Sequence, residues 1–275
     1  MKKSIILLSV LALGFAANAQ EHPRTPRRYD FELSDIARRI TPVLSFNRDM
    51  HADGWVWKEG RSSALTEKGK SADFYEITKL SDTFIDEGKI FFDEPMPIPI
   101  PTTAWVEGVA GDGIGEWVIV PIKPRNDDVA ERLANREIRY PLTVRLFVCN
   151  GYQQSVDLYQ KNNRVKEAKI SVYAAAYSAG QDDAYLLWNP DCVYEETITL
   201  NDDIIENPVC LNYHTEDFFI TLPEKYRTED CELYLKLEIR SVYKGTKYSD
   251  TCISEMCATV DAAGERRLAA KGNEI

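Results

Sequence analysis

Three acidic side chains lie within one glycine-rich stretch, Thr102–Trp117, of this 275-residue sequence. The stretch reads TTAWVEGVAGDGIGEW, and its four glycines between positions 108 and 115 predict a tightly turned loop. It matches neither GxGxxG nor the P-loop, and its carboxylates, Glu107, Asp112 and Glu116, would repel a phosphate. They could instead accept hydrogen bonds from sugar hydroxyls or hold a cation. The alternative is a purely structural loop.

Catalysis is the second chemistry that carboxylates permit. Glu107 and Glu116 could act as acid and base on a glycosidic bond. However, the sequence has no nucleophile elbow, no metal-ligand cluster and no histidine placed with a serine or cysteine. Because Asp and Glu together number 44, one pair is weak evidence for a hydrolase. We therefore expect a non-enzymatic protein with no catalytic residues.

A polar and aromatic set further along the chain has the composition of a sugar site. Its members are Asn150, Tyr152, Asn162, Asn163 and Arg164. Sugars stack their CH faces on aromatic rings, and their hydroxyls bond planar polar groups, so we predict that these side chains bind a ligand together with Glu107 and Asp112. The alternatives are structural, because Asn-Gly is a common turn and Arg164 could pair with Glu107 or Glu116.

The elements that would position these side chains are mostly strands. Apolar and polar residues alternate in Leu142–Val148, Ala168–Val172 and Leu233–Ile239, which predicts strands with one face on a core. Further strand candidates are Trp117–Val120, Asp217–Leu222 and Thr251–Val260. One internal helix is expected at Asp127–Arg136. Regular strands with little helix predict an all-β sandwich or jelly roll.

The N-terminal region predicts export. Lys2 and Lys3 precede the apolar run Ser4–Phe15, and Ala17-Asn18-Ala19 is a small-x-small cleavage site, as in a secretory signal peptide. A retained anchor helix is the alternative. No later segment reaches the ~18 apolar residues of a membrane helix. We expect a periplasmic, surface-attached or secreted protein.

Charge and cysteine content limit the partners further. The net charge of −11 would repel nucleic acid, so we expect no nucleic-acid partner. Six cysteines in an exported chain permit three disulfides in fifteen possible pairings. Without CxxC or histidine-rich spacing, a zinc site is not expected.

Several blocks in order resemble the NADase-type glycan-binding domain family. They are Ser62–Leu65, Thr103–Gly108 with Gly113–Trp117, Asn150–Tyr152, Tyr159 with Asn162–Lys166, and Lys247–Glu255. The resemblance implies a discoidin-like, galactose-binding-fold jelly roll and glycan binding. It does not imply NADase activity, because the chain leaves no room for a separate catalytic domain. Two departures are an Asp82 without the family's following Gly, and a long region at 174–228.

The wider discoidin fold also implies a structural calcium ion. In that fold the ligands are an early Asp, the Thr of a Thr-x-Trp strand and a late Glu, which Asp82, Thr103 and Glu255 resemble. Calcium takes six to eight oxygens, so backbone carbonyls would complete the shell. Alternatively, Glu255 pairs with a Lys or Arg, or is simply hydrogen-bonded.

We therefore expect four segments. They are a signal peptide at 1–19, an N-terminal extension with a short helix at 20–60, a discoidin-like domain at 61–260, and a mobile tail at 261–275. The predicted function is non-catalytic glycan recognition through end loops of the sandwich. A structural or protein-interaction sandwich without sugar affinity is the first alternative, and a glycan hydrolase is the less favoured second.

Overall fold

The computed structural model describes residues 60–81, 100–124, 141–179, 185–205, 210–227 and 231–261. The expected signal peptide, the helix of the N-terminal extension, the helix at 127–136 and residues 262–275 of the tail lie outside the described residues, and so does Asp82.

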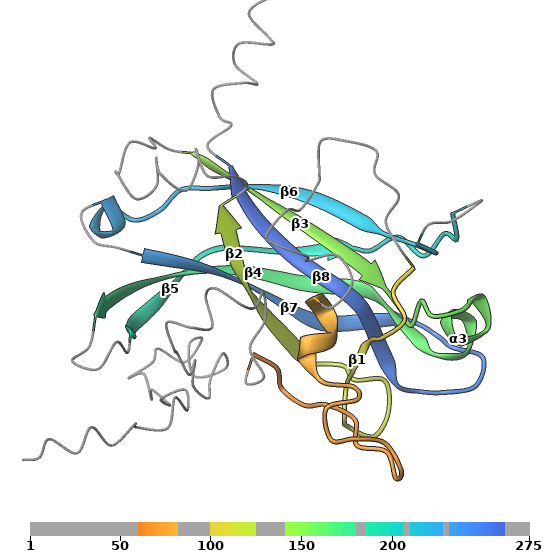
Figure 1. Ribbon diagram of the computed structural model, residues 1–275. Helices are drawn as coiled ribbons and strands as arrows, with labels where there is room; N and C mark the ends of the chain where they lie inside the picture. Colours follow the sequence, from red (N-terminus) through yellow and green to blue (C-terminus); the bar gives the residue numbers. More distant parts are fainter. Residues whose placement is uncertain are drawn as a thin grey trace, which may run out of the picture.

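Eight strands form the described body of the molecule (Figure 1). They are β1 (Trp105–Val106), β2 (Trp117–Pro124), β3 (Leu142–Asn150), β4 (Asn163–Ala179), β5 (Tyr185–Thr199), β6 (His214–Ile220), β7 (Cys231–Tyr243) and β8 (Thr251–Asp261). The described residues also include three short helices: η2 (Ile77–Ser81) before β1, α3 (Val156–Lys161) between β3 and β4, and η3 (Glu224–Arg227) between β6 and β7. This composition confirms the predicted all-β class.

The strand order is β5-β4-β7-β2-β8-β3-β6, with β1 added to β8. Neighbours are antiparallel except β2–β8 and β4–β8, which are parallel. The β4–β8 pairing, at Asn163 with Thr251, joins strands that are distant in the strand order. The sheet therefore folds over on itself, with β5, β4 and β7 in one layer and β8, β3 and β6 in the other (Figure 1).

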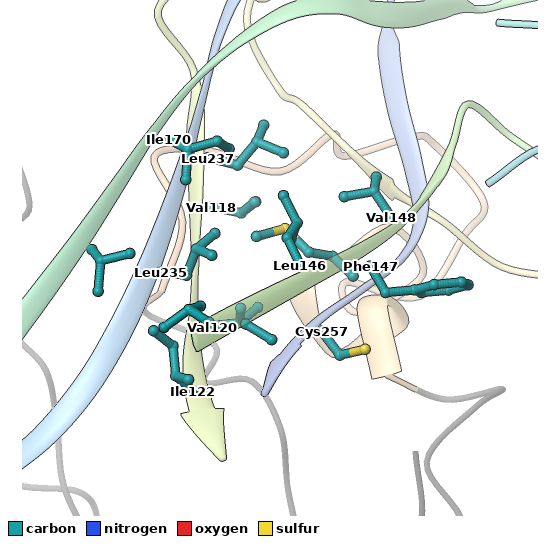
Figure 2. Packing of buried hydrophobic residues seen from close by; sticks show 14 of the residues in the cluster. Val118, Val120, Ile122, Leu146, Phe147, Val148, Ile170, Leu235, Leu237 and Cys257 are labelled. Atoms are coloured by element: carbon teal, nitrogen blue, oxygen red, sulfur yellow. The ribbon is translucent and has the colours of Figure 1, made fainter. Parts of the chain in front are cut away.

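The core fills the space between these layers. Leu142, Val144, Leu146 and Val148 of β3 are buried against the leucines of β7, and Figure 2 shows Leu146 among Val118 and Leu235. The polar residues of β7 alternate with its leucines, so the strand's apolar face meets the core. The predicted alternation between a core face and a solvent face is confirmed at the start of β3 and in the first half of β4. It is wrong for the middle of β4 and for β7, where Ser171, Tyr173, Tyr234 and Lys236 on the second face are also buried.

Strand β8 is buried on both faces, unlike an ordinary strand of a two-layer sandwich. Ten consecutive residues, Thr251–Val260, are buried. One face meets the core, and η2 packs against the strand with buried Ile77 and Leu80. Phe147 and Cys257 lie beside this helix in Figure 2. A strand that is covered on both faces is typically a continuous apolar run. Residues 252–260, with the sequence CISEMCATV, are mostly apolar.

Helix α3 was not predicted. The sequence signal for this helix is limited to its first turn. Ser155 is the N-cap, and its side chain accepts a hydrogen bond from the Leu158 N–H; Asp157 follows in the first turn. The long region at 174–228 holds the end of β4 together with β5, β6 and η3. Its length therefore reflects strands of the sandwich, not only loops.

Replacing Leu146 with alanine tests the core. We expect the free energy of unfolding to fall by about 2–5 kcal/mol, because the change leaves a cavity between the two layers. Val156→Ala, on the exposed side of α3, should change it by less than about 0.5 kcal/mol. Urea denaturation measures both variants, and equally small effects would contradict the assignment of Leu146 to the core.

Candidate functional site

The carboxylate of Glu107 lies beneath the glycine-rich loop. It is fully buried, and it accepts hydrogen bonds from the N–H of Val109 (2.8 Å) and of Thr251 (3.2 Å). Burial raises the pKa of Glu107, and the two backbone hydrogen bonds oppose that shift. Gly113 adopts φ 66°, and a Cβ there would lie 2.6 Å from Glu107 Cγ. The loop therefore needs glycine at 113 to close over this carboxylate.

The second carboxylate, Glu116, is held by the Ser-Ser block. Its Oε2 accepts hydrogen bonds from the hydroxyls of Ser62 (2.6 Å) and Ser63. Ser63 Oγ also accepts from the Gly108 N–H (2.8 Å), and Ser62 Oγ accepts from the Trp117 N–H (2.9 Å). The two serines thus fasten both ends of the loop. Both carboxylates of the suggested acid–base pair bond groups of their own chain.

Asp112 projects from the same loop toward its neighbours. Its Oδ1 accepts a hydrogen bond from Asn163 Nδ2 (3.2 Å), and its Oδ2 pairs with Lys244. The Lys244 hydrogen bond lowers the pKa of Asp112. The backbone oxygen of Asp112 accepts from Thr251 Oγ1 (2.7 Å). These contacts join the glycine-rich loop to the start of β8.

Asn163 connects the glycine-rich loop to the loop between β7 and β8. Besides Asp112, its Nδ2 donates to the Ser249 carbonyl (2.6 Å), and its Oδ1 accepts from the Gly245 N–H (2.8 Å). Its own N–H donates to the Asp250 carbonyl (3.0 Å). One buried amide therefore holds three segments together: the glycine-rich loop, the start of β4 and residues 244–250.

Arg164 has a partner that the sequence did not identify. Its Nε and Nη2 each bond one carboxylate oxygen of Asp202 at 2.8 Å, and the Tyr159 hydroxyl donates to the same carboxylate (2.8 Å). The guanidinium carbon lies 5.1 Å from the Tyr159 ring centroid. The suggested pairing of Arg164 with Glu107 or Glu116 is therefore replaced by a bidentate pair with Asp202. At Gly151 (φ 77°) a Cβ would lie 2.5 Å from Arg164 Cγ, so glycine is needed there too.

The remaining predicted ligand residues are also engaged inside the fold. Asn150 is buried, and its amide donates to the Val165 carbonyl (2.7 Å) and accepts from the Val165 N–H (2.9 Å), as a paired strand residue would. Asn162 Nδ2 donates to the Leu158 carbonyl at the end of α3 (2.9 Å). Tyr152 packs in a second apolar cluster with Cys252 and others. The predicted set thus converges on one end of the sandwich, largely beneath its surface.

Different side chains face solvent at this end. Ile114 is 54% exposed and Val109 is also exposed, both from the glycine-rich loop. Tyr248, from the loop between β7 and β8, is 39% exposed, and Lys247 Nζ lies 4.8 Å from its ring centroid. Lys244 is exposed as well. Tyr248 lies in Lys247–Glu255, the last of the sequence blocks that resemble the family. This resemblance is the signal in the sequence that could have identified Tyr248 as a functional residue.

The model described as "NAD glycohydrolase translocation F5/8 type C domain" matches residues 99–259. The chain belongs to this family. The match supports the resemblance drawn from the sequence blocks and identifies the sandwich as discoidin-like. Of those blocks, only Ser62–Leu65 lies before the matched range, yet its serines are hydrogen-bonded to the F5/8 type C domain at Glu116.

No curated protein matches the chain. Among solved structures, a cleaved adhesin domain of Lys-gingipain from Porphyromonas gingivalis aligns with 54% of this chain at 12% identity, with a TM-score of 0.22. The chain spans 64% of the length of that domain.

Two of the three predicted calcium ligands lie within the described part of the F5/8 type C domain. β1 and β8 pair antiparallel with Trp105 opposite Ile253; Thr103 lies two residues before this pair in the chain and Glu255 two residues after it. Among the described residues, no group of three His, Cys, Asp or Glu side chains could hold a metal ion. A calcium site would therefore need the Thr103 oxygens, backbone carbonyls and residues outside the described part, so calcium stays a prediction.

None of the helices in the described part of the chain is long and apolar enough to cross a membrane.

Gly113→Ala tests how tightly the loop closes over Glu107. We expect a loss of about 2–4 kcal/mol in the free energy of unfolding, from left-handed strain plus the clash with the buried carboxylate. Gly115→Ala is the matched control, because its φ is 91° but a Cβ would meet nothing within 4 Å. Strain alone should cost it about 1–2 kcal/mol. Equal losses in chemical denaturation would show that the close approach to Glu107 is unimportant.

Proposed function

We propose that this F5/8 type C domain is an exported, non-catalytic binding module that recognises a glycan through its end loops. The observation that carries the proposal is the connection made by Asn163, which ties the glycine-rich loop to residues 244–250 beside the Asp112–Lys244 ion pair. We name the surface of residues 108–116 and 244–250 the end-loop platform. Loops fixed in this way lose little conformational entropy on binding.

The chemistry exposed on the end-loop platform suits a polyhydroxylated ligand. Tyr248 offers an aromatic ring on which the CH face of a sugar can stack. Asp112 and Lys244 place an acceptor and a donor on the same surface, and both retain solvent exposure. Asn163, Arg164 and Glu107 would then act behind the surface by positioning these loops.

A non-catalytic role is favoured by the state of the acidic residues. Glu107 is buried against backbone N–H groups, and Glu116 is hydrogen-bonded to two serines. A glycosidase needs two carboxyl groups facing its substrate. The family description names translocation for this domain type and no reaction of its own, which agrees with a recognition role.

Protein recognition is the second candidate, favoured by a different observation. Val109 and Ile114 expose apolar side chains on the same end-loop platform. Apolar residues with a polar surround are typical of protein contact surfaces. Both candidates use one surface, so one set of variants distinguishes them.

Tyr248→Ala tests the glycan proposal. We expect wild-type protein to bind specific glycans on an array, and this variant to lose at least about tenfold in affinity, because it lacks the stacking ring. Phe219→Ala is the matched control, since Phe219 is also an exposed aromatic (49%) but lies on β6. Both variants should keep the wild-type melting temperature.

Two results would contradict glycan recognition by the end-loop platform. One is an array without specific hits. The other is specific binding that Tyr248→Ala and Phe219→Ala leave equally intact. An empty array, combined with a protein partner whose binding is lost in Ile114→Asp, would establish the second candidate.

Calcium binding is part of the same proposal and has its own test. Thr103 and Glu255 would supply oxygens, and the ion would tie β1 to β8 near the end loops. We expect calcium to raise the melting temperature of the wild type, magnesium to raise it less, and calcium to have no effect on Glu255→Gln. Absence of both a thermal shift and heat in a calcium titration would refute calcium binding.

A further inference from the structure

Three buried thiols belong to the main core cluster of the described chain. They are Cys149 in β3, Cys257 in β8, and Cys210 shortly before β6. The Cys149 and Cys210 thiols lie close enough for each to shift the pKa of the other. Both are in the reduced form in the structure.

Separate contacts hold the chain around Cys210 against the end of β3. Gln153 accepts a hydrogen bond from the Leu211 N–H (2.9 Å) and donates to the Asn150 carbonyl (3.0 Å). Two residues further on, the Tyr213 ring stacks on Phe147 with centroids 5.8 Å apart. The residues that follow Cys210 therefore hold this part of the chain against β3.

Strand geometry disfavours the competing pairings. Cys257 lies opposite Phe147, so it is diagonal to Cys149 at roughly 7–8 Å, which is too far for a disulfide. Cys252 belongs to the second apolar cluster. Cys192 in β5 and Cys231 in β7 pair with Tyr173 and Ala176 of the intervening β4, which keeps their backbones more than roughly 9–10 Å apart.

We propose that Cys149 and Cys210 form a disulfide when the chain folds in the presence of a disulfide donor. One thiolate attacks the donor disulfide and expels one donor thiol. The other protein thiolate then attacks the resulting mixed disulfide and releases the second donor thiol. The protein loses two electrons and two protons, and the donor gains them. Both thiols are buried after folding, so the exchange takes place before or during folding.

The two thiols differ in acidity once the protein is folded. The hydrogen bond from Cys149 lowers the pKa of Cys210, while burial raises that of Cys149. These shifts belong to the folded protein and do not set the order of attack, because the exchange takes place before or during folding.

The bridge would fix a segment on which the end loops depend. The Ile205 N–H donates to the Leu211 carbonyl (2.9 Å), and Asn212 Nδ2 donates to the Asp203 carbonyl (2.9 Å). The segment that contains Asp203 and Ile205 also carries Asp202, the partner of Arg164. This role does not depend on whether the end-loop platform binds a glycan.

The full chain, unfolded and reduced, tests the proposal when it is refolded in a mixture of reduced and oxidised glutathione. After alkylation and digestion without reduction, mass spectrometry should find the Cys149 peptide linked to the Cys210 peptide. Alkylation of both residues, or a link from either one to a different cysteine, would overturn the proposal. This readout needs no variant and is unaffected by ligand binding.

Thermal denaturation supplies the second measurement. Reduction with dithiothreitol should lower the wild-type melting temperature by about 10 °C, as expected for a bridge closing a loop of about 60 residues. Cys149→Ala with Cys210→Ala should melt near the reduced wild type and be insensitive to dithiothreitol. Cys252→Ala should keep the full response to dithiothreitol, and a wild type that does not respond would contradict the bridge.

Discussion

Strand β8 is the element on which the described structure depends. It pairs with β3 along most of its length, with β2 near its end, and with β1 and β4 at its beginning. A strand buried on both faces must satisfy its backbone groups on both edges, since water cannot reach them. The four partner strands do this, and they bring chain segments from residues 105 to 164 to the first residues of β8. The end loops gather there for that reason.

The strands were predictable because their signal is local. Alternation in β3 and β7 comes from one face meeting the core, and the sequence carries that pattern directly. Helix α3 has too few residues for periodicity to be visible. The partner of Arg164 could not be predicted either, because Asp202 is 38 residues away and is delivered by the β4–β5 pairing. The family resemblance indicated which end of the sandwich holds the candidate site. It could not indicate which side chains at that end face solvent.

The inward position of the predicted residues has a chemical reason. Asparagine amides and arginine guanidinium groups are planar and form paired hydrogen bonds, which suits sugar hydroxyls and backbone peptide groups equally. Asn150 uses this geometry to replace a strand neighbour for Val165, and Asn163 uses it to join two loops. Residue type alone cannot distinguish these uses. Exposure distinguishes them, and it depends on tertiary packing such as the closure of Gly113 over Glu107.

Buried polar groups of this kind set how the end loops can behave. Glu107, Asn150 and Asn163 are all removed from water, so opening the loops would expose hydrogen-bonding partners that were arranged for one geometry. Each broken bond in such a site costs about 1–3 kcal/mol. A surface held by several such bonds stays in one conformation. Its exposed residues are therefore in position before a ligand binds. If the end-loop platform binds a glycan as we propose, specificity must come from the side chains that project beyond the network. Tyr248 is the clearest of these, because Asp112 pairs with Lys244 and also bonds Asn163.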